Sequence, residues 1–184
     1  MQGALSIPAI MDYAADVHGG ARILSATVEG GLHDYSLLDA SKRIARLAHA
    51  LRAMGIGPGD RVATLAWNGY RHFELYYAIA GIGAVCHTIN PRLFPEQIVY
   101  IINHAEDRAV FVDADFLPLV EAVADKCPGV EHWVVLTDEA HMPETSLPGA
   151  ICYERLVHGH SDQFDWPELD ERQACALCYT SGTT

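Results

Sequence analysis

The amino-acid sequence predicts an α/β protein with a mostly parallel sheet and helices on both faces. Apolar runs bounded by turn residues, which are typical of strands, alternate along the chain with segments whose apolar residues recur at a helical period. Such alternation at short spacing favours parallel strands joined by right-handed helical crossovers. The chain has 184 residues, of which 50% are hydrophobic and 20% charged, and this is enough for one compact domain with a real core. The pattern shows no internal repeat and no domain boundary.

The first predicted elements are a hairpin and an amphipathic helix. Residues 21–28 have the pattern of a strand, a turn with paired glycines follows, and 33–36 are expected to return as the partner strand. Ser36 is expected to cap the next helix with Asp39 as its capping-box partner, and Gly55 suits the C-terminal stop. The apolar positions of this helix that follow a helical period are Ile44, Leu47, Ala48, Leu51 and Met54.

Strands and helices then alternate along the rest of the chain. The nearly continuous apolar run 62–67 suits a strand buried on both faces of a parallel sheet. Pro95 fits the first position of a helix, whereas the stretch 137–171, with several prolines, has the least regular pattern. Further strands are expected at 84–89, 109–112, 132–136 and 174–179, and further helices at 71–81, 95–104, 116–126 and 153–158.

Composition excludes some classes of partner. Lysine and arginine number 12 against 24 acidic residues, and the resulting net charge of −12 repels nucleic-acid phosphates and anionic lipid headgroups. The only tight basic group lies on a predicted helix and contains Lys42, Arg43 and Arg46. We expect it to form a solvated face rather than a phosphate-binding patch, and we expect no nucleic acid as a partner.

No segment predicts secretion or a membrane span. Residues 1–16 contain no basic residue, unlike secretory signals and transit peptides. The longest uncharged stretch, 75–91, includes glycines and an expected turn, so no transmembrane segment is expected. The 5 cysteines are irregularly spaced, which favours free thiols in a reducing cytoplasm.

Two short patterns resemble metal-binding motifs but are not expected to hold a metal. Cys175 and Cys178 are separated so that, on a strand, their side chains point to opposite faces of the sheet. His158 and His160 lie in a polar loop, and the other histidines are spread evenly along the chain.

Residues that follow the strands are the first candidates for a binding site, because ligands of open α/β sheets bind beyond the carboxyl ends of the strands. Most of them are expected to be turn or cap residues. The loop 180–184 differs, since it offers hydroxyls, a glycine and a run of backbone N–H groups after a strand expected to be buried. Phosphate oxygens accept such donors, although the loop is not a Walker A motif. The other candidates are Asn68, Asn90, Arg92 and Asp113.

At this loop the sequence resembles a known family. Tyr179-Thr-Ser-Gly-Thr-Thr184 is similar to the start of the signature phosphate loop of adenylate-forming enzymes, which include acyl-CoA synthetases, luciferases and peptide-synthetase adenylation domains. In that family the motif continues Gly-x-Pro-Lys-Gly. Further similar segments, in the family's order, are 35–38, 55–63, Asn68, 80–84 and 90–93. The resemblance covers nearly the whole chain, and it implies that residues 1–184 form the N-terminal part of an AMP-binding domain.

Two segments refine the resemblance. His87-Thr-Ile-Asn-Pro-Arg-Leu93 and Tyr100-Ile-Ile-Asn-His-Ala-Glu-Asp107 are similar to bacterial medium- and long-chain fatty-acid–CoA ligases. The implied reaction has two steps: a carboxylate attacks the α-phosphate of ATP to give acyl-adenylate and pyrophosphate, and the thiol of coenzyme A then displaces AMP.

The resemblance also implies roles for individual residues. Thr180, Ser181, Gly182, Thr183 and Thr184 would hold the β- and γ-phosphates of ATP, and Thr180 would help to hold Mg²⁺ with a Glu further along the family sequence. The family's loop lysine, adenine and ribose contacts, hinge and C-terminal catalytic lysine correspond to positions beyond residue 184. We therefore expect no catalytic residue within the 184 residues and no ligase activity from them alone.

Other functions remain open at this point. An aryl or short-chain acid could be the substrate of the same chemistry, and the chain could instead be a non-catalytic binding or dimerisation module. A homodimer is compatible with the family, and an enzyme acting on lipid-soluble acids could work at a membrane surface.

Overall fold

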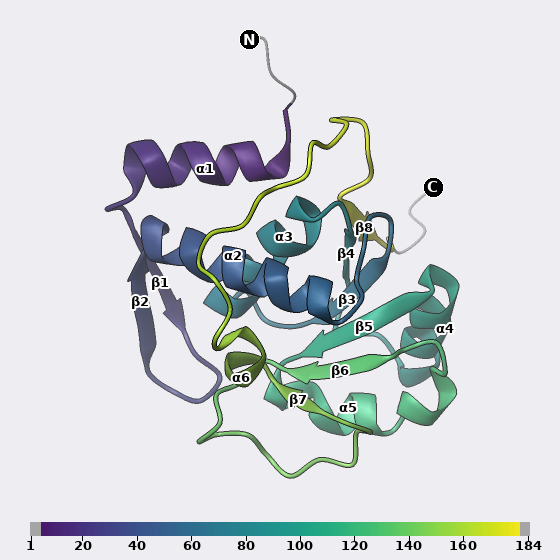
Figure 1. Ribbon diagram of the computed structural model, residues 1–184. Helices are drawn as coiled ribbons and strands as arrows, with labels where there is room; N and C mark the ends of the chain where they lie inside the picture. Colours follow the sequence, from purple (N-terminus) through teal and green to yellow (C-terminus); the bar gives the residue numbers. More distant parts are fainter. Residues whose placement is uncertain (1–4, 181–184) are drawn as a thin grey trace.

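The computed structural model describes residues 5–180 and is built around a parallel sheet (Figure 1). Its strand order is β7-β6-β5-β3-β4-β8, and every pairing in this sheet is parallel. The predicted mostly parallel sheet is thus confirmed. The strands are β3 (Arg61–Leu65), β4 (Val85–Thr88), β5 (Asp107–Val112), β6 (His132–Val135), β7 (Ile151–Cys152) and β8 (Ala176–Cys178).

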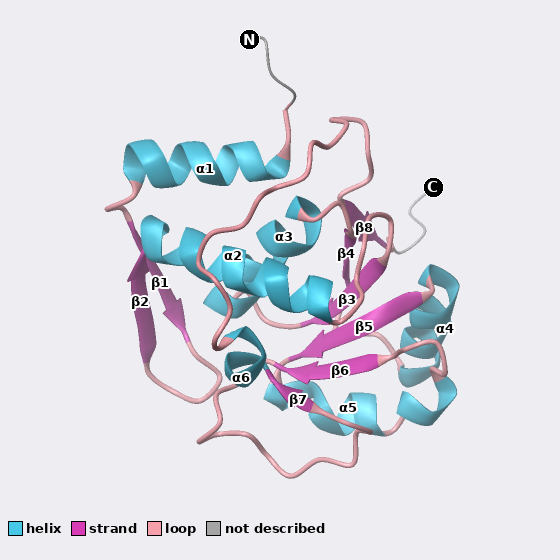
Figure 2. Cartoon of the chain, viewed as in Figure 1, coloured by secondary structure: helices cyan, strands magenta, loops and turns pink. Residues whose placement is uncertain are grey.

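Helices cover both faces of the sheet, as predicted (Figure 2). One face carries α1 (Ile7–His18), α2 (Leu37–Ala53), α3 (Tyr70–Gly81) and α6 (Tyr153–Val157). The other face carries α4 (Pro95–Ala105) and α5 (Leu117–Glu121). Pro95 stands at the start of α4, where its missing N–H leaves no helical hydrogen bond unmade.

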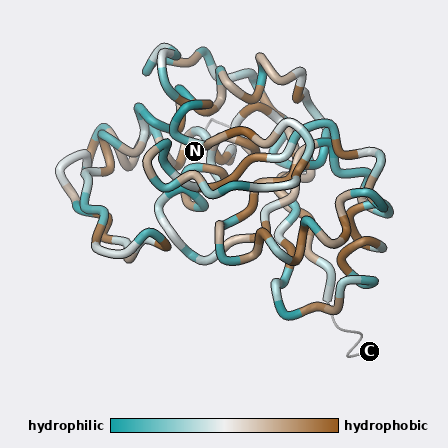
Figure 3. The backbone as a smooth tube through the Cα atoms, turned by 90° about the horizontal axis from the view of Figure 1, so that it is seen from below, coloured by the Kyte–Doolittle hydropathy of each residue, from teal (hydrophilic) through white to brown (hydrophobic). Residues whose placement is uncertain are grey.

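The central strands are buried on both faces. Val62 belongs to the apolar cluster beneath α2 and α3, whereas the next residue, Ala63, belongs to the cluster beneath α4 and α5. This alternation is the pleat of a strand covered on both sides, and it explains the unbroken apolar run in the sequence. In Figure 3, where the tube is coloured by residue hydropathy, several of the inner segments are made of hydrophobic residues.

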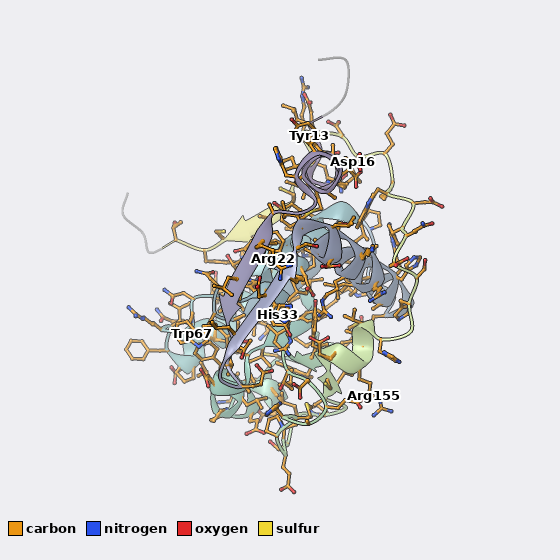
Figure 4. All side chains as sticks on the ribbon, turned by 90° about the vertical axis from the view of Figure 1, so that its left-hand side faces the viewer. Tyr13, Asp16, Arg22, His33, Trp67 and Arg155 are labelled. Atoms are coloured by element: carbon orange, nitrogen blue, oxygen red, sulfur yellow. The ribbon has the colours of Figure 1, made fainter. Side chains whose placement is uncertain are left out.

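An antiparallel hairpin lies beside this sheet, as the sequence predicts. It consists of β1 (Arg22–Ala26) and β2 (Leu32–Ser36). Figure 4 shows the hairpin with Arg22 and His33 labelled. The chain enters α2 directly from β2. Ser36 Oγ accepts the backbone N–H of Asp39 at 3.0 Å, and the Asp39 carboxylate accepts the backbone N–H of Ser36 at 3.3 Å, which confirms the capping box. At the far end, Gly55 takes a φ of 80°.

Several predicted elements differ from the structure. Helix α1 and the short strand β7 were not predicted. The helix predicted at 116–126 is too long: an α-helix covers only Leu117–Glu121, with short 3₁₀ helices at 114–116 and 124–126. The strand predicted at 174–179 is short and lies at the edge of the sheet, where Ala176 and Cys178 are exposed rather than buried.

The basic group on α2 is not simply a solvated face. Arg43 Nε donates to Glu74 Oε1 at 2.6 Å, and its Nη2 donates to both carboxylate oxygens of Glu154 at 3.0 Å. Arg71 binds the same Glu154 and also Glu29, which precedes β2. These ion pairs join α2, α3, α6 and the hairpin, so the prediction for Arg43 is corrected.

A long segment without helix or strand, residues 158–175, connects α6 to β8 and crosses the face that carries α2 and α3 (Figure 1). We call it the strap. Trp166 packs on Gly81 so tightly that an added Cβ would lie 2.6 Å from its ring. Gln173 Nε2 donates to the carbonyl of Gly83 at 2.8 Å. The strap therefore carries the chain from one edge of the sheet to the other.

Within residues 5–180, none of the helices combines the length and the apolarity needed to cross a bilayer.

Candidate functional site

The candidate site begins where β4 and β8 leave the sheet. These neighbouring strands are parallel, with Thr88 opposite Cys178, so Asn90 and Thr180 lie just beyond them at the carboxyl end. Both residues line a groove of about 410 Å³ between α4 and the end of β8. The groove is lined by Asn90, Leu93, Glu96, Gln97, Tyr100, Ile101, Tyr179 and Thr180.

Of the predicted phosphate-loop residues, Thr180 is placed and the others are not. Thr180 is exposed and borders the groove, so its hydroxyl is accessible to a ligand. Ser181, Gly182, Thr183 and Thr184 lie outside the described residues. An accessible hydroxyl oxygen at the carboxyl end of a parallel strand fits both a phosphate, as donor, and Mg²⁺, as a hard oxygen ligand.

Tyr179, which leads into Thr180, is fixed on two sides. Its hydroxyl shares a hydrogen bond of 2.6 Å with Nδ1 of His104, at the end of α4. Its ring centroid lies 5.2 Å from that of His87, at an interplanar angle of 48°. Burial raises the pKa of Tyr179, helped by the nearby carboxyl of Asp107, so the phenol stays neutral near pH 7.

Two of the other strand-end candidates, Asn90 and Asp113, have local structural tasks. Asn90 Oδ1 accepts the backbone N–H of Arg92 at 3.0 Å, which is the hydrogen bond of an Asx turn. Asp113 Oδ2 accepts the backbone N–H of Trp67 at 2.6 Å and ties the end of β5 to the end of β3. Burial raises the pKa of Asp113 to about 6. Asn68 and the side chain of Arg92 are exposed.

Sequence reasoning did not single out His87, His104 and Asp107 as site residues. His87 Nδ1 lies 2.7 Å from Asp107 Oδ2, and both side chains are completely buried. The available signal was their position in the two segments that resemble fatty-acid–CoA ligases, 87–93 and 100–107. The structure brings these segments together around Tyr179.

The cysteines and the histidine pair have separate surroundings. All five thiols are free, as predicted. Cys178 Sγ lies 3.4 Å from Thr88 Oγ1, whereas Cys175 lines a different groove, bordered by α1 and α3. His160 stacks with His49 of α2, with 6.3 Å between ring centroids.

A doubly covered parallel sheet with a groove at the carboxyl end of its strands is the arrangement in which open α/β proteins bind ligands. The chain belongs to the AMP-binding enzyme family, whose model matches residues 11–184. The resemblance to adenylate-forming enzymes is therefore confirmed.

Curated relatives cover the whole of this chain and are acid–CoA ligases by name. The chain is 46% identical over 184 residues to the 3-methylmercaptopropionyl-CoA ligase of Ruegeria lacuscaerulensis, and spans 34% of that protein. It is 44% identical to the medium-chain-fatty-acid–CoA ligase of Ectopseudomonas oleovorans, of which it spans 34%. It is 41% identical to the long-chain-fatty-acid–CoA ligase of Thermus thermophilus, of which it spans 32%. The chain thus spans about a third of these relatives' length.

Solved structures share the fold. The anthranilate CoA ligase AuaEII, in complex with anthranoyl-AMP, matches with a TM-score of 0.86 at 22% identity, over 100% of this chain and 34% of that one. Coronafacic acid ligase from Pectobacterium brasiliense matches with a TM-score of 0.82 at 18% identity, over 95% of this chain and 33% of that one. At these identities the likeness shows the fold alone.

Proposed function

We propose that residues 1–184 are the N-terminal part of the AMP-binding domain of an AMP-forming fatty-acid–CoA ligase. The enzyme would condense a carboxylic acid with ATP to acyl-adenylate and pyrophosphate, and then transfer the acyl group to the thiol of coenzyme A. The observation that carries this proposal is the position of Tyr179 and Thr180. They leave β8 at the carboxyl end of the sheet, inside the region matched by the family.

In this proposal the loop 180–184 holds the β- and γ-phosphates. The first step brings two anions together, so hydrogen-bond donors and positive charge are needed where charge develops. Thr180 and the following Ser181, Gly182, Thr183 and Thr184 supply hydroxyl and amide donors. Bound Mg²⁺, for which the Thr180 hydroxyl is a suitable ligand, would neutralise phosphate charge. Asn90 and Tyr179 line the same groove.

The groove offers little positive charge of its own. Among the described residues that line it, only Glu96 is charged, and the chain as a whole carries a net charge of −12. An anionic nucleotide therefore needs cations from the metal and from elsewhere in the enzyme. For this reason we expect the 184 residues alone to have no ligase activity, in keeping with a span of about a third of the relatives.

The acid is proposed to be a medium- or long-chain fatty acid. Support comes from relatives with those names at 44% and 41% identity. A second candidate is a short acid, because an equally similar relative, at 46%, is a 3-methylmercaptopropionyl-CoA ligase.

The test is acid-dependent ATP–pyrophosphate exchange by the full-length protein with octanoate, palmitate, 3-methylmercaptopropionate and benzoate. The fatty-acid proposal predicts the highest kcat/KM with octanoate or palmitate, and a preference for 3-methylmercaptopropionate would move the substrate to the second candidate. Thr180→Val should lower the exchange rate. Thr27→Val, the same change in the hairpin turn, should not, since Thr27 Oγ1 only donates to the carbonyl of Gly30 at 2.9 Å. No exchange with any acid would refute the ligase reaction.

We also propose a cytoplasmic enzyme that can form a homodimer and associate with membrane surfaces. Ile10, Tyr13 and Val17 on α1 are each more than half exposed, and such an apolar strip suits contact with another surface.

The alternative of a small non-catalytic module is tested by the mass of the native protein in its source cells, detected with an antibody raised against residues 1–184. A band several times heavier than 20.1 kDa supports the ligase, and a band only at 20.1 kDa supports the module.

A further inference from the structure

A buried polar pair lies beneath the candidate site. His87, in β4, faces the same side of the sheet as its neighbour Ala63 in β3. Asp107, the first residue of β5, reaches it from the other side of β3, and 2.7 Å separates His87 Nδ1 from Asp107 Oδ2. Both side chains are 0% exposed. This pair is not among the groups proposed to bind ATP.

Stability alone is a poor explanation of this pair. His87 Nε2 and Asp107 Oδ1 are buried and have no hydrogen-bond partner within residues 5–180. Buried polar atoms left unpaired cost stability, and an apolar pair of similar size would avoid that cost. Burial raises the pKa of Asp107, against the opposing effect of His87. A fixed geometry explains the pair better than its contribution to folding does.

What the pair holds in place is the ring of His87, and that ring contacts Tyr179. The hydrogen bond to Asp107 uses Nδ1 and so fixes the orientation of the imidazole. The Tyr179 ring lies against it with 5.2 Å between centroids, and the exposed side chain of His104 shares a hydrogen bond with the Tyr179 hydroxyl. Within residues 5–180, β8 has exposed side chains on either side of Leu177, and both histidines contact Tyr179, the residue that follows the strand.

We propose that His87, oriented by Asp107, is a positioning residue for Tyr179 and thereby fixes where the loop 180–184 begins. The effect on catalysis rests on the proposed function, since it assumes that this loop holds the phosphates of ATP. The positioning itself does not. The proposal also gives a physical meaning to the two fatty-acid-ligase-like segments, because His87 lies in one and Asp107 in the other.

The central variant is His87→Asn in the full-length protein. The amide nitrogen of asparagine can stand where Nδ1 of histidine stands, so Asp107 keeps a hydrogen-bond partner while the ring beside Tyr179 is lost. His104→Gln removes the second contact of Tyr179 from an exposed position and should fold normally. The matched control is His141→Gln, since His141 is exposed and, among residues 5–180, its side chain pairs only with Asp138 in the same turn.

The first readout is the ¹⁹F spectrum of 3-fluorotyrosine placed at position 179 alone. His87→Asn and His104→Gln should each shift or broaden its resonance, and His141→Gln should leave it unchanged. The second readout is steady-state kinetics. Misplacement by about 1 Å can cost roughly a hundredfold, so we expect kcat/KM for ATP to fall roughly tenfold to a hundredfold while KM for the acid stays constant.

The two readouts separate failure of this inference from failure of the proposed function. An unchanged fluorine resonance in both His87→Asn and His104→Gln overturns the positioning role, whatever the kinetics. If the two variants shift the resonance but the unsubstituted enzyme shows no exchange with any acid, the positioning role stands and the ligase reaction is refuted. A shifted resonance with unchanged ATP kinetics in an active enzyme overturns the link between Tyr179 and the phosphate loop.

Discussion

The hydroxyl of Tyr153 donates a hydrogen bond of 2.6 Å to Oε2 of Glu74, and both residues are 0% exposed. Their positions are far apart in the sequence, in α6 and α3. Burial raises the pKa of Glu74, and the adjacent guanidinium of Arg43 opposes that shift. The contact therefore joins two helices through a carboxylate that water cannot reach.

Tyr153→Phe should lower the free energy of unfolding by about 1.5–3 kcal/mol, because it removes a hydrogen bond to a buried carboxylate without creating a large cavity. Urea denaturation measures the change. Tyr13→Phe, on the exposed side of α1, serves as the control and should stay within about 0.5 kcal/mol of the parent protein. Equal losses in the two variants would contradict the prediction.

Asp113→Asn should change how stability depends on pH. Burial raises the pKa of Asp113 from 3.8 to about 6, so the folded protein favours the protonated carboxyl. The contribution of this carboxyl group to the free energy of unfolding is fully present below pH 3.8, and it is lost as the pH rises through about 6. Asparagine stays neutral and can still accept the N–H of Trp67. The free energy of unfolding of the variant, minus that of the parent protein, should thus be on the order of 3 kcal/mol larger above pH 6 than at low pH.

Unfolding free energies of both proteins across this pH range provide the measurement. The comparison cancels the titration of all other carboxyl groups, provided they are unaffected by the substitution. A difference that stays constant with pH would show that Asp113 titrates as it would in water.

Gly81→Ala should displace the strap. A Cβ at this position would lie 2.6 Å from Cζ3 of Trp166, so the indole must move. Overpacking of this kind typically costs about 1–3 kcal/mol. We expect a red shift of tryptophan fluorescence and faster proteolysis within 158–175. Gly129→Ala is the matched control, since an added Cβ there would meet no atom of the described chain within 4 Å, its chain neighbours aside. Identical spectra for the two variants would argue against tight packing at Gly81.

Ser36→Ala should destabilise α2 by about 1 kcal/mol, because its hydroxyl accepts the N–H of Asp39 at the helix start. Ser41→Ala, one turn further along, removes only a bond from Oγ to the carbonyl of Leu38. Such back-bonding inside a helix adds little stability, so this variant should be nearly neutral. Thermal unfolding of the pair gives the comparison, and a larger loss for Ser41→Ala would reverse the argument.

Much of the fold follows from local patterns that the sequence displays directly. The capping box at Ser36, the proline that opens α4 and the apolar run of β3 each act within a few residues, and each was predicted correctly. Helix α1 was missed, although Ser6 and Pro8 give a start signal, because its outer face remains apolar and the helical period is blurred.

The candidate site was only partly predictable. Thr180 was predicted as a site residue because its loop has a recognisable residue order, and its role in phosphate binding stays a prediction. The contacts among His87, His104 and Tyr179 join separate segments, and no periodicity announces them. Arg43 was misjudged for the same reason, since its carboxylate partners lie on α3 and α6.

The strap has a consequence for the order of events during synthesis. Strand β8 pairs with β4 through residues such as Ala176 and Cys86, and the other strands described in this sheet all precede it in the sequence. Closing this long loop costs conformational entropy, which the packing of the strap, including Trp166 on Gly81, must offset before β8 can pair. A nascent chain can therefore assemble β3 to β7 with their helices first. The groove beside Thr180 is complete only when the strap has crossed this layer and β8 has paired with β4.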